Sequence, residues 1–398
     1  METSGSSGDD AYSGLVLDGQ FRLEQPLGNG SMARVYRARH LSIDRDVAVK
    51  ILRHELLEQS DVVARFKREA QIAAKLAHPN VIVVHAVGEI PNVHTGIGGE
   101  PYVTLELLGG PSLAKVLGDC GETLPLARAL HIVLSVCDAL GEAHAQGIVH
   151  RDVKPENVML VRRGGDDDFV KVLDFGLAKT LDDPGSWHTR AGAVLGTPRY
   201  LSPEGAEGRA VTPAADCYAI ATLLYRCLAG RTPFDGPNAV GILVQQSSAE
   251  PPDIRGWPAS REVPEPIARV IMQNLAKRPE SRAVDARALG RALVDAARAA
   301  GLDGEQIGLS STLLGSTRRW SGGEALRRHV DSNGSTRDPS TTSPERRGVP
   351  ANGSRLPSAR AKREITRRLA LFVACFMLGA AAAAGVASRM GALSGSLE

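Results

Sequence analysis

The polar residues of segment 152–157, together with position 174, are of the types that handle phosphate groups. Asp152, Lys154 and Asn157 stand at short spacing, and Asp174 follows later in the chain. Phosphoryl transfer needs an oriented hydroxyl nucleophile, a cation beside the transferring group and hard oxygen ligands for a metal ion. We expect Asp152 to take or hold the proton of the attacking hydroxyl and Lys154 to stabilise the transferring group. Asn157 and Asp174 would then hold magnesium, with manganese as an alternative ion.

The motifs that contain these residues read HRDVKPEN at 150–157 and DFG at 174–176. Both match the signature of protein kinases, and the chain resembles the bacterial eukaryotic-like (Hanks-type) serine/threonine kinases with one membrane helix. The resemblance extends over residues 21–300. It implies a non-specific protein serine/threonine kinase that transfers the γ-phosphate of ATP to Ser and Thr hydroxyls of proteins, itself included. His150 and Phe175 are expected to be packing residues.

The resemblance also implies a glycine loop over the phosphates and, after it, a strand that carries a lysine. The segments LGNGSMARV at 27–35 and VAVK at 47–50 fit these two features. A lone G-x-G is more often a tight turn, but its position ahead of Lys50 favours a nucleotide site. Ala33 replaces the third glycine of the pattern and restricts positive φ there, while Gly28 and Gly30 remain suited to close phosphate approach. The expected nucleotide contacts in this loop are Leu27, Gly28, Asn29, Gly30 and Ser31.

Lys50 needs a carboxylate that holds it over the α and β phosphates, and in kinases that carboxylate comes from the next helix. Glu69, within RFKREA at 65–70, fits this role. Glu55 and Glu58 are the alternatives, but they precede the regular helical stretch and are expected on a solvated face.

The segment YVTLELL at 102–108 is expected to form a strand and the hinge. By resemblance, Leu105 would be the gatekeeper, and Glu106 and Leu108 would offer backbone groups to adenine. The ring would be sandwiched by the side chains of Val35, Ala48 and Met159. Ordinary core packing is the alternative for these apolar residues, and the sequence leaves both open.

Acceptor specificity is indicated by Lys154 together with Gly196-Thr197-Pro198 and Ser202-Pro203-Glu204. In Ser/Thr kinases, the threonine equivalent to Thr197 contacts the catalytic Asp and Lys. The resemblance further implies that Glu204 pairs with Arg282 and that Asp216 anchors the catalytic loop from below. Ser202 replaces the usual Ala of its motif, which is a small change at a buried corner.

Regulation by phosphorylation is indicated by Arg151, which stands directly before Asp152. Kinases with this arginine commonly require a phosphate on the activation segment, which neutralises and orders it. Thr189 is the candidate acceptor, since Ala191 and Ala193 occupy two other positions where a phosphothreonine is expected. An unmodified loop residue is the alternative for Thr189.

The elements that must position these residues follow from the hydrophobic pattern. Strands are predicted at 20–27, 34–39 and 46–52, and helices at 62–76, 127–146 and 216–228. Strands lead and helices follow, without an internal repeat, which indicates an α+β domain with a bilobal protein kinase fold. We expect a small β-rich N-lobe at 21–108, a larger helical C-lobe at 109–300 and a cleft between them. The polar insert at 162–168 is expected to be an exposed hairpin tip and not a metal site.

Residues 301–368 are rich in Ser, Thr, Gly, Pro and Arg, so we expect a disordered juxtamembrane linker there. The uncharged stretch 369–387 approaches the roughly 20 residues that cross a bilayer as a helix. Basic residues crowd its N-terminal flank. The positive-inside rule therefore leaves the kinase domain in the cytoplasm and residues 388–398 outside the inner membrane. An Ala-rich helix that packs on protein or lies at the interface is the alternative.

The composition excludes other classes of protein. The chain has 398 residues with a formal net charge of +2, which is too small to imply a nucleic-acid partner. Its cysteines include no C-x-x-C pair, so neither a disulfide framework nor a zinc site is expected. Residues 1–15 lack a basic segment followed by an apolar one, so we expect a flexible N-terminus at 1–20 without a signal peptide.

Two other functions remain open from the sequence. A nucleotide-binding pseudokinase that acts as a membrane-tethered scaffold is the main alternative, although pseudokinases usually lack one of the catalytic residues present here. A small-molecule kinase of related fold is disfavoured by the segment 196–204, which serves peptide docking in protein kinases. The outer tail is too short to fold as a sensor, so signals are expected through partners or through a homodimer.

Overall fold

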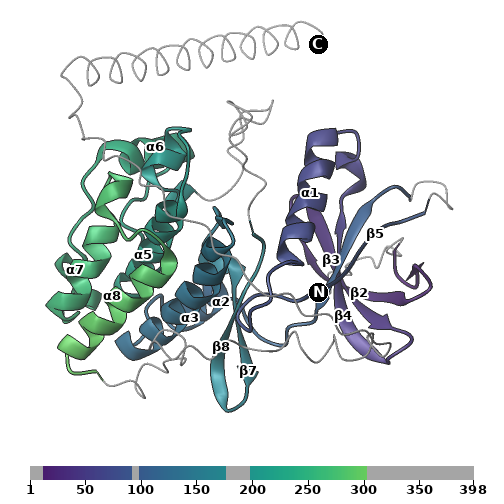
Figure 1. Ribbon diagram of the computed structural model, residues 1–398, viewed down its shortest axis with the longest axis horizontal. Coiled ribbons are helices and arrows are strands. Elements are labelled where there is room, and N and C mark those ends of the chain that lie inside the picture. The colour runs from purple at the N-terminus through teal and green to yellow at the C-terminus, as the bar shows by residue number, and fades with distance from the viewer. Residues whose placement is uncertain (1–11, 92–97, 176–197, 303–398) are drawn as a thin grey trace, which may run out of the picture. The chain divides into compact units, whose positions relative to one another are not determined.

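The computed structural model describes residues 12–91, 98–175 and 198–302 (Figure 1). The predicted linker from residue 303 onward, the predicted membrane helix at 369–387, and the candidate residues Thr189 and Thr197 lie outside these ranges. No helix within the described ranges is both long enough and apolar enough to cross a bilayer.

The smaller lobe is built on one antiparallel sheet with the strand order β1-β2-β3-β4-β6-β5 (Figure 1). Its strands are β1 (Val16–Leu17), β2 (Phe21–Asn29), β3 (Ala33–His40), β4 (Arg45–Leu52), β5 (Val84–Glu89) and β6 (Pro101–Glu106). Side chains alternate between the two faces of a strand, so one face buries Leu23, Tyr36, Val49, Ile51 and Tyr102 in one cluster. Lys50 alternates with Val49 and Ile51 and therefore faces the other side of the sheet.

Residues 12–20, which the sequence places in a flexible N-terminus, pack against this sheet and contribute β1 to it. Tyr12 is buried, and its hydroxyl donates to Glu100 at 3.1 Å. Asp18 accepts a hydrogen bond from the Tyr102 hydroxyl, and β1 pairs with β2. The contacts of Tyr12 and Asp18 left no local pattern in the sequence, because their partners Glu100 and Tyr102 lie far away in the chain.

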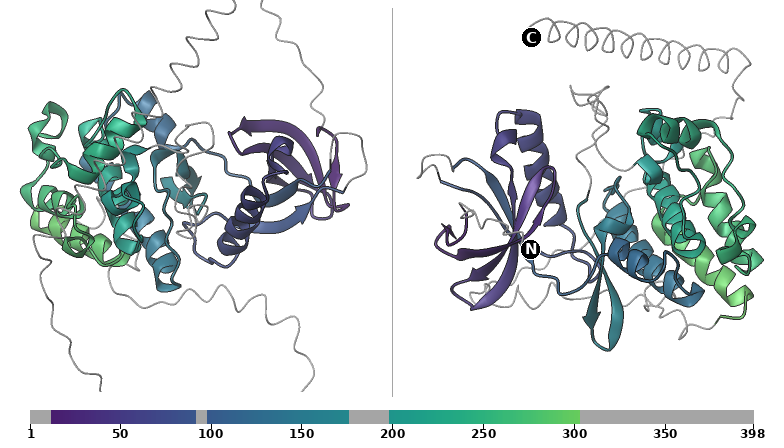
Figure 2. Two further views of the ribbon diagram at one scale, coloured as in Figure 1. Left: turned by 90° about the horizontal axis from the view of Figure 1, so that it is seen from above. Right: turned by 180° about the vertical axis from the view of Figure 1, so that it is seen from behind.

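Helix α1 (Ser60–Ala73) covers the face of the sheet to which Lys50 points (Figures 1 and 2). Its buried residues Val62, Phe66 and Ala70 recur every four positions and form one apolar stripe. The stripe packs in one cluster with Leu52 and Val103 of the sheet. This packing holds Glu69, the neighbour of Ala70, on the side of the helix that approaches β4.

The larger lobe is helical, and its helices α3 and α5 are largely buried among the others (Figure 2). The helices are α2 (Leu113–Asp119), α3 (Leu126–Ala145), α4 (Pro203–Ala206), α5 (Pro213–Ala229), α6 (Ala239–Ser248), α7 (Glu265–Asn274) and α8 (Ala286–Ala299). Short 3-10 turns are η1 (His54–Leu56), η2 (Pro155–Asn157), η3 (Pro198–Tyr200), η4 (Ile254–Gly256), η5 (Pro258–Ser260) and η6 (Pro279–Ser281). Helix α5 begins at a proline and ends at Gly230 with φ 73°, which are favoured residues for a helix start and stop.

The polar insert is the tip of the hairpin formed by β7 (Val158–Arg163) and β8 (Asp166–Val172). Its acidic side chains diverge, because Asp166 lies 3.0 Å from His131, Asp167 2.5 Å from Arg162 and Asp168 2.8 Å from Arg128. The insert is therefore a hairpin tip, as expected. Among the described residues, no group of three or more metal-binding side chains is assembled.

Candidate active site

The catalytic loop around Asp152 is fixed by the buried carboxylate of Asp216. Asp216 stands in the first turn of α5 and accepts hydrogen bonds from the backbone N–H groups of His150 (2.7 Å) and Arg151 (2.8 Å). His144 Nε2 lies 2.8 Å from the same carboxylate. These contacts hold Arg151 at a φ of 67°, a left-handed conformation that a non-glycine residue keeps only where its surroundings impose it.

Lys154 and Asn157 both turn toward Asp152. Lys154 Nζ donates to Asp152 Oδ2 at 2.7 Å, and Asn157 Nδ2 donates to the same oxygen at 3.0 Å. Asn157 Nδ2 also donates to the backbone carbonyl of Asp152 at 2.8 Å. Asn157 ends the 3-10 turn η2, so the chain reverses within one turn and returns its side chain to Asp152. The short spacing of these polar residues in the sequence thus becomes direct contact.

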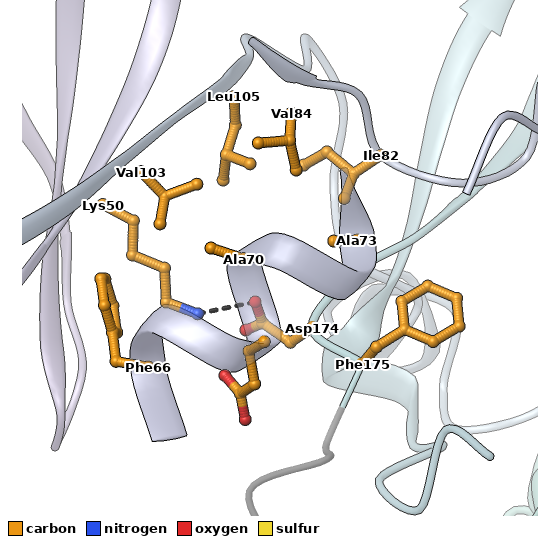
Figure 3. A pocket seen from close by; sticks show the side chains of 11 residues that line it. Lys50, Phe66, Ala70, Ala73, Ile82, Val84, Val103, Leu105, Asp174 and Phe175 are labelled. Carbon is orange, nitrogen blue, oxygen red and sulfur yellow. Dashed lines mark hydrogen bonds and ion pairs between the residues drawn. The ribbon is translucent and has the colours of Figure 1, made fainter. Parts of the chain in front are cut away.

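Lys50 and Asp174 meet in a small cavity beside α1 (Figure 3). Lys50 Nζ lies 2.6 Å from Asp174 Oδ1. Loss of hydration lowers the pKa of Lys50, but the nearby carboxylates of Asp174 and Glu69 outweigh it, and the pKa is raised above its ordinary value. Loss of hydration raises the pKa of Asp174, but the Lys50 ammonium outweighs it, and this pKa is lowered. Both groups are therefore charged at neutral pH.

Glu69 lines the same cavity, whose volume is about 30 Å³. Apolar side chains form most of its remaining wall: Phe66, Ala70, Ala73, Ile82, Val84, Val103, Leu105 and Phe175 (Figure 3). Glu55 and Glu58, the alternatives to Glu69, are exposed outside α1. Asp174 is hydrogen-bonded to Lys50, and Glu69 adds its negative charge to the same cavity.

His150 links the catalytic loop to the segment of Asp174. Its Nδ1 accepts from the backbone N–H of Asp152 at 3.2 Å, and its Nε2 lies 2.9 Å from the carbonyl oxygen of Leu173. The hydrogen bonds therefore assign the proton to Nε2. The buried ring also packs against Phe175 with 4.7 Å between centroids. Beyond the expected packing, this bridge couples the positions of Asp152 and Asp174, the latter held at a φ of 43°.

Strands β2 and β3 carry the glycine loop. Gly28 lies opposite Val35 in the register, and the Gly30 N–H donates to the Ala33 carbonyl at 2.9 Å, which closes the turn. A Cβ at Gly30 would lie 3.2 Å from the Ala33 oxygen, whereas a Cβ at Gly28 would meet no atom within 4 Å. A side chain at Gly30 would thus crowd the tight turn, and Gly28 leaves open backbone.

The apolar residues expected around adenine come from separate strands. Ala48 of β4 is buried opposite Leu105 of β6, and Val35 of β3 is partly buried. Met159 of β7 is also partly buried and forms an isolated bridge to Ser112 ahead of α2. Val35 and Met159 therefore keep apolar surface beyond their core contacts.

Glu106 is held by a lysine that the sequence did not single out. Lys171 Nζ, from β8, lies 2.5 Å from Glu106 Oε1 and 3.2 Å from the Val81 carbonyl. The Val83 N–H donates to the same Oε1 at 2.9 Å, and the Glu106 N–H donates to the Val83 carbonyl at 3.0 Å. The backbone N–H of Glu106 is therefore already hydrogen-bonded within the protein. In the sequence, Lys171 stands between two valines, which is the one sign of an unusual position. The pattern of this strand did not indicate which of its faces is buried.

Arg282 and Glu204 form the expected ion pair below the substrate segment. Two hydrogen bonds of 2.9 Å join them, and both side chains are almost fully buried. Arg282 also donates to the backbone carbonyls of Ala214, Ala276 and Lys277. Ser202 accepts a hydrogen bond from the Gly205 N–H at 3.3 Å and caps α4, a contact that alanine at this position lacks.

A second, polar cavity of about 350 Å³ lies beside the catalytic loop. Pro155 and Glu156 of the loop line it together with residues of α2, η3 and the end of α5. Arg199 and Asp235 on its wall pair at 2.7 Å, and Arg226 pairs with Glu122. The paired charges make this a polar recess without a strong preference for one sign.

The comparisons with known proteins agree with this geometry. The family model described as protein kinase domain matches residues 21–292, and the chain belongs to that family. The chain is 41% identical over 284 residues to the serine/threonine-protein kinase pkn3 of Myxococcus xanthus, covering 70% of this chain and 50% of that protein. It is 39% identical to PknB of Mycolicibacterium smegmatis, covering 67% of this chain and 41% of that protein.

Among solved structures, the Mycobacterium tuberculosis PknI kinase domain matches with a TM-score of 0.55 and 27% identity. The match covers 71% of this chain and 98% of that one. The bilobal kinase fold expected from the sequence is therefore confirmed for the described part of the chain. The chain spans half or less of the length of the curated relatives named above.

Proposed function

We propose that the chain is an active protein serine/threonine kinase that transfers the γ-phosphate of ATP to Ser or Thr hydroxyls of proteins, its own included. The observation that carries the proposal is the convergence of Lys154 and Asn157 on Asp152, coupled through His150 to the segment of Asp174. The relatives bear the name serine/threonine-protein kinase, which supports the acceptor class. A pseudokinase scaffold is disfavoured because the residues expected for catalysis are all present. Lys154 contacts Asp152, and Lys50 and Glu69 line the cavity that contains Asp174.

The polar residues take complementary parts in the transfer. Asp152 orients the attacking hydroxyl and accepts its proton, and Lys154 stabilises the negative charge of the transferring group from its place beside Asp152. Lys50, held by Asp174 and by the charge of Glu69, contacts the α and β phosphates. Asp216 and His150 position the loop, and Thr197 would contact Asp152 and Lys154.

The oxygen donors of the site suit magnesium. Asn157 donates from its amide nitrogen to Asp152, and Asp174 accepts from Lys50 at Oδ1. Among the described residues, Asn157 Oδ1 and Asp174 Oδ2 remain for a cation. Amide and carboxylate oxygens are the ligands that Mg²⁺ prefers, and Mn²⁺ accepts the same donors. We assign Asn157 and Asp174 to the ion, which, when bound, neutralises phosphate charge.

The nucleotide would lie under the glycine loop. Gly28 offers open backbone to the phosphates, with Leu27, Asn29, Gly30 and Ser31 around it. The adenine ring would pack between Val35 and Ala48 on one side and Met159 on the other, near the backbone of Glu106 and Leu108. The second cavity, beside Glu156, would receive part of the protein substrate.

Purified protein incubated with labelled ATP and Mg²⁺ tests the proposal. We expect label on phosphoserine or phosphothreonine of the chain and of an added protein substrate, and loss of labelling when EDTA removes the metal ion. Asp152→Asn protein purified in parallel controls for contaminating kinases. Label in both proteins, or in neither, would exclude an active kinase.

Phosphorylation at Thr189 is proposed to activate the enzyme. Loss of hydration lowers the pKa of the Arg151 guanidinium despite the nearby Asp216 carboxylate, so a phosphate close to Arg151 would stabilise its charge. Thr189→Ala is expected to lower the turnover of a protein that has been allowed to phosphorylate itself, whereas Ser186→Ala in the same segment should not. Unchanged turnover of Thr189→Ala would remove Thr189 from this role.

We further propose that the stretch 369–387 anchors the kinase domain to the cytoplasmic face of the inner membrane, where a homodimer or another partner brings the activating signal. The full chain is expected to stay with membranes after an alkaline carbonate wash, and a chain that ends at residue 302 is expected in the soluble fraction. Release of the full chain by carbonate would favour a helix that only lies on the surface.

A further inference from the structure

Arg53, the first residue after β4, is bonded to the tip of the glycine loop, defined here as residues 29–32. Its Nε donates to the Gly30 carbonyl at 2.9 Å, and its Nη2 donates to Asn29 Oδ1 at 2.7 Å. Its backbone N–H donates to the Met32 carbonyl at 3.0 Å. The side chain and the backbone of Arg53 therefore hold three residues of the tip, namely Asn29, Gly30 and Met32.

The backbone that carries Arg53 is itself fixed on the opposite side. His54 Nδ1 lies 2.7 Å from Glu100 Oε1, and the carboxylate of Glu100 is fully buried. Glu100 also accepts from the Tyr12 hydroxyl at 3.1 Å and from the Gly98 N–H at 2.7 Å. Arg53 is thus tied to the body of the small lobe, and the glycine-loop tip is tied to Arg53.

The charge of Arg53 is available to the phosphates that the tip would cover. Within the described ranges, no carboxylate lies within 4.0 Å of its guanidinium, so its hydrogen bonds go to neutral acceptors. Arg53 follows Lys50 by three residues and lies just beyond the end of β4. Its position therefore combines a mechanical restraint on the loop with a positive charge beside the loop tip.

We propose that Arg53 is a positioning residue for ATP, an inference that rests on the proposed kinase function. It holds the glycine-loop tip in place before the nucleotide arrives. Gly28 and Gly30 give the loop more backbone freedom than other residues would, and ordering a free loop on binding weakens affinity. The planar guanidinium bridges the acceptors on Asn29 and Gly30 at once, which a lysine ammonium on its flexible chain does not reproduce.

Equilibrium binding of a non-hydrolysable ATP analogue with Mg²⁺ tests the proposal on the full chain. Arg53→Met is expected to raise the Kd about threefold to tenfold, where tenfold corresponds to about 1.4 kcal/mol. Arg53→Lys, which keeps the charge, is also expected to bind more weakly than the wild type. The KM for ATP should rise in parallel while the KM for a peptide substrate stays unchanged, and hydrogen exchange of the loop amides should become faster.

Arg22→Met is the matched control, because Arg22 is exposed on β2 and makes no side-chain hydrogen bond or ion pair within the described ranges. Arg53→Lys keeps the test valid if Arg53→Met fails to fold, and Asn29→Ala removes one of the bonds from the loop side. In a double-mutant cycle, the pair should cost less than the sum of the single changes. Additive effects, or a folded Arg53→Met protein that binds like the control, would overturn the proposal.

Nucleotide binding is measured without turnover, so the two proposals fail separately. A wild-type chain that binds the analogue but transfers no phosphate would refute the kinase function. The effect of the Arg53 variants on nucleotide binding could still be interpreted.

Discussion

Asp152→Asn is expected to lower kcat about 10²-fold to 10⁴-fold, the usual contribution of a positioned general acid or base. Asparagine keeps an oxygen that accepts the hydrogen bond from Lys154 Nζ, so the loop geometry should persist while the charge and the basicity are lost. The Kd for Mg²⁺–ATP should stay close to that of the wild type, because Asp152 lies toward the acceptor and not among the proposed ligands of the nucleotide. Steady-state kinetics with a peptide substrate and equilibrium nucleotide binding measure the two quantities.

Asp167→Asn is the matched control for this change. Asp167 lies at the exposed tip of the β7–β8 hairpin and pairs there only with the exposed Arg162 among the described residues. Its replacement should leave kcat unchanged. A folded Asp152→Asn protein that keeps more than about a tenth of the wild-type kcat would contradict the role of Asp152, since the expected loss is at least about 10²-fold. Parallel loss of nucleotide binding would point to a structural cause instead.

The part of the site that could be predicted lies within short stretches of the chain. Asp152, Lys154 and Asn157 meet because a single turn joins them. Their short spacing in the sequence was therefore enough to predict that they lie together. The resemblance to protein kinases indicated Lys50 and Glu69, and the hydrophobic pattern predicted the strand and the helix that carry them. Their elements are confirmed within a few residues, since α1 occupies 60–73 where helical spacing indicated 62–76.

The contacts that could not be predicted join residues far apart in the chain. Lys171 reaches Glu106 across 65 positions, and Arg53 reaches Asn29 across 24. A lysine is predicted to lie at the surface unless a partner for its charge is known, because lysine is almost never fully buried without one. The buried position of Tyr12 could not be predicted for the same reason, because Glu100, which accepts the Tyr12 hydroxyl, comes 88 positions later.

Arg282→Met is expected to destabilise the domain by about 3–5 kcal/mol, because it leaves the buried Glu204 carboxylate without its cation. The backbone carbonyls of Ala214, Ala276 and Lys277 lose their donor as well. Methionine retains much of the apolar bulk, so the loss measures the polar contacts more than a cavity. The free energy of unfolding from urea titration, followed by circular dichroism, gives the value.

Arg269→Met is the control, since Arg269 forms an exposed pair with Glu265 one helical turn away and should change stability by less than about 1 kcal/mol. The double variant Arg282→Met/Glu204→Leu should be more stable than Arg282→Met alone, because it removes the stranded carboxylate. If Arg282→Met proves as stable as the control, the buried pair does not hold the lobe together.

Ala214 stands two residues before Asp216, so loosening this end of α5 should also weaken the anchor of the catalytic loop. Activity of Arg282→Met is therefore expected to fall at temperatures below its global unfolding.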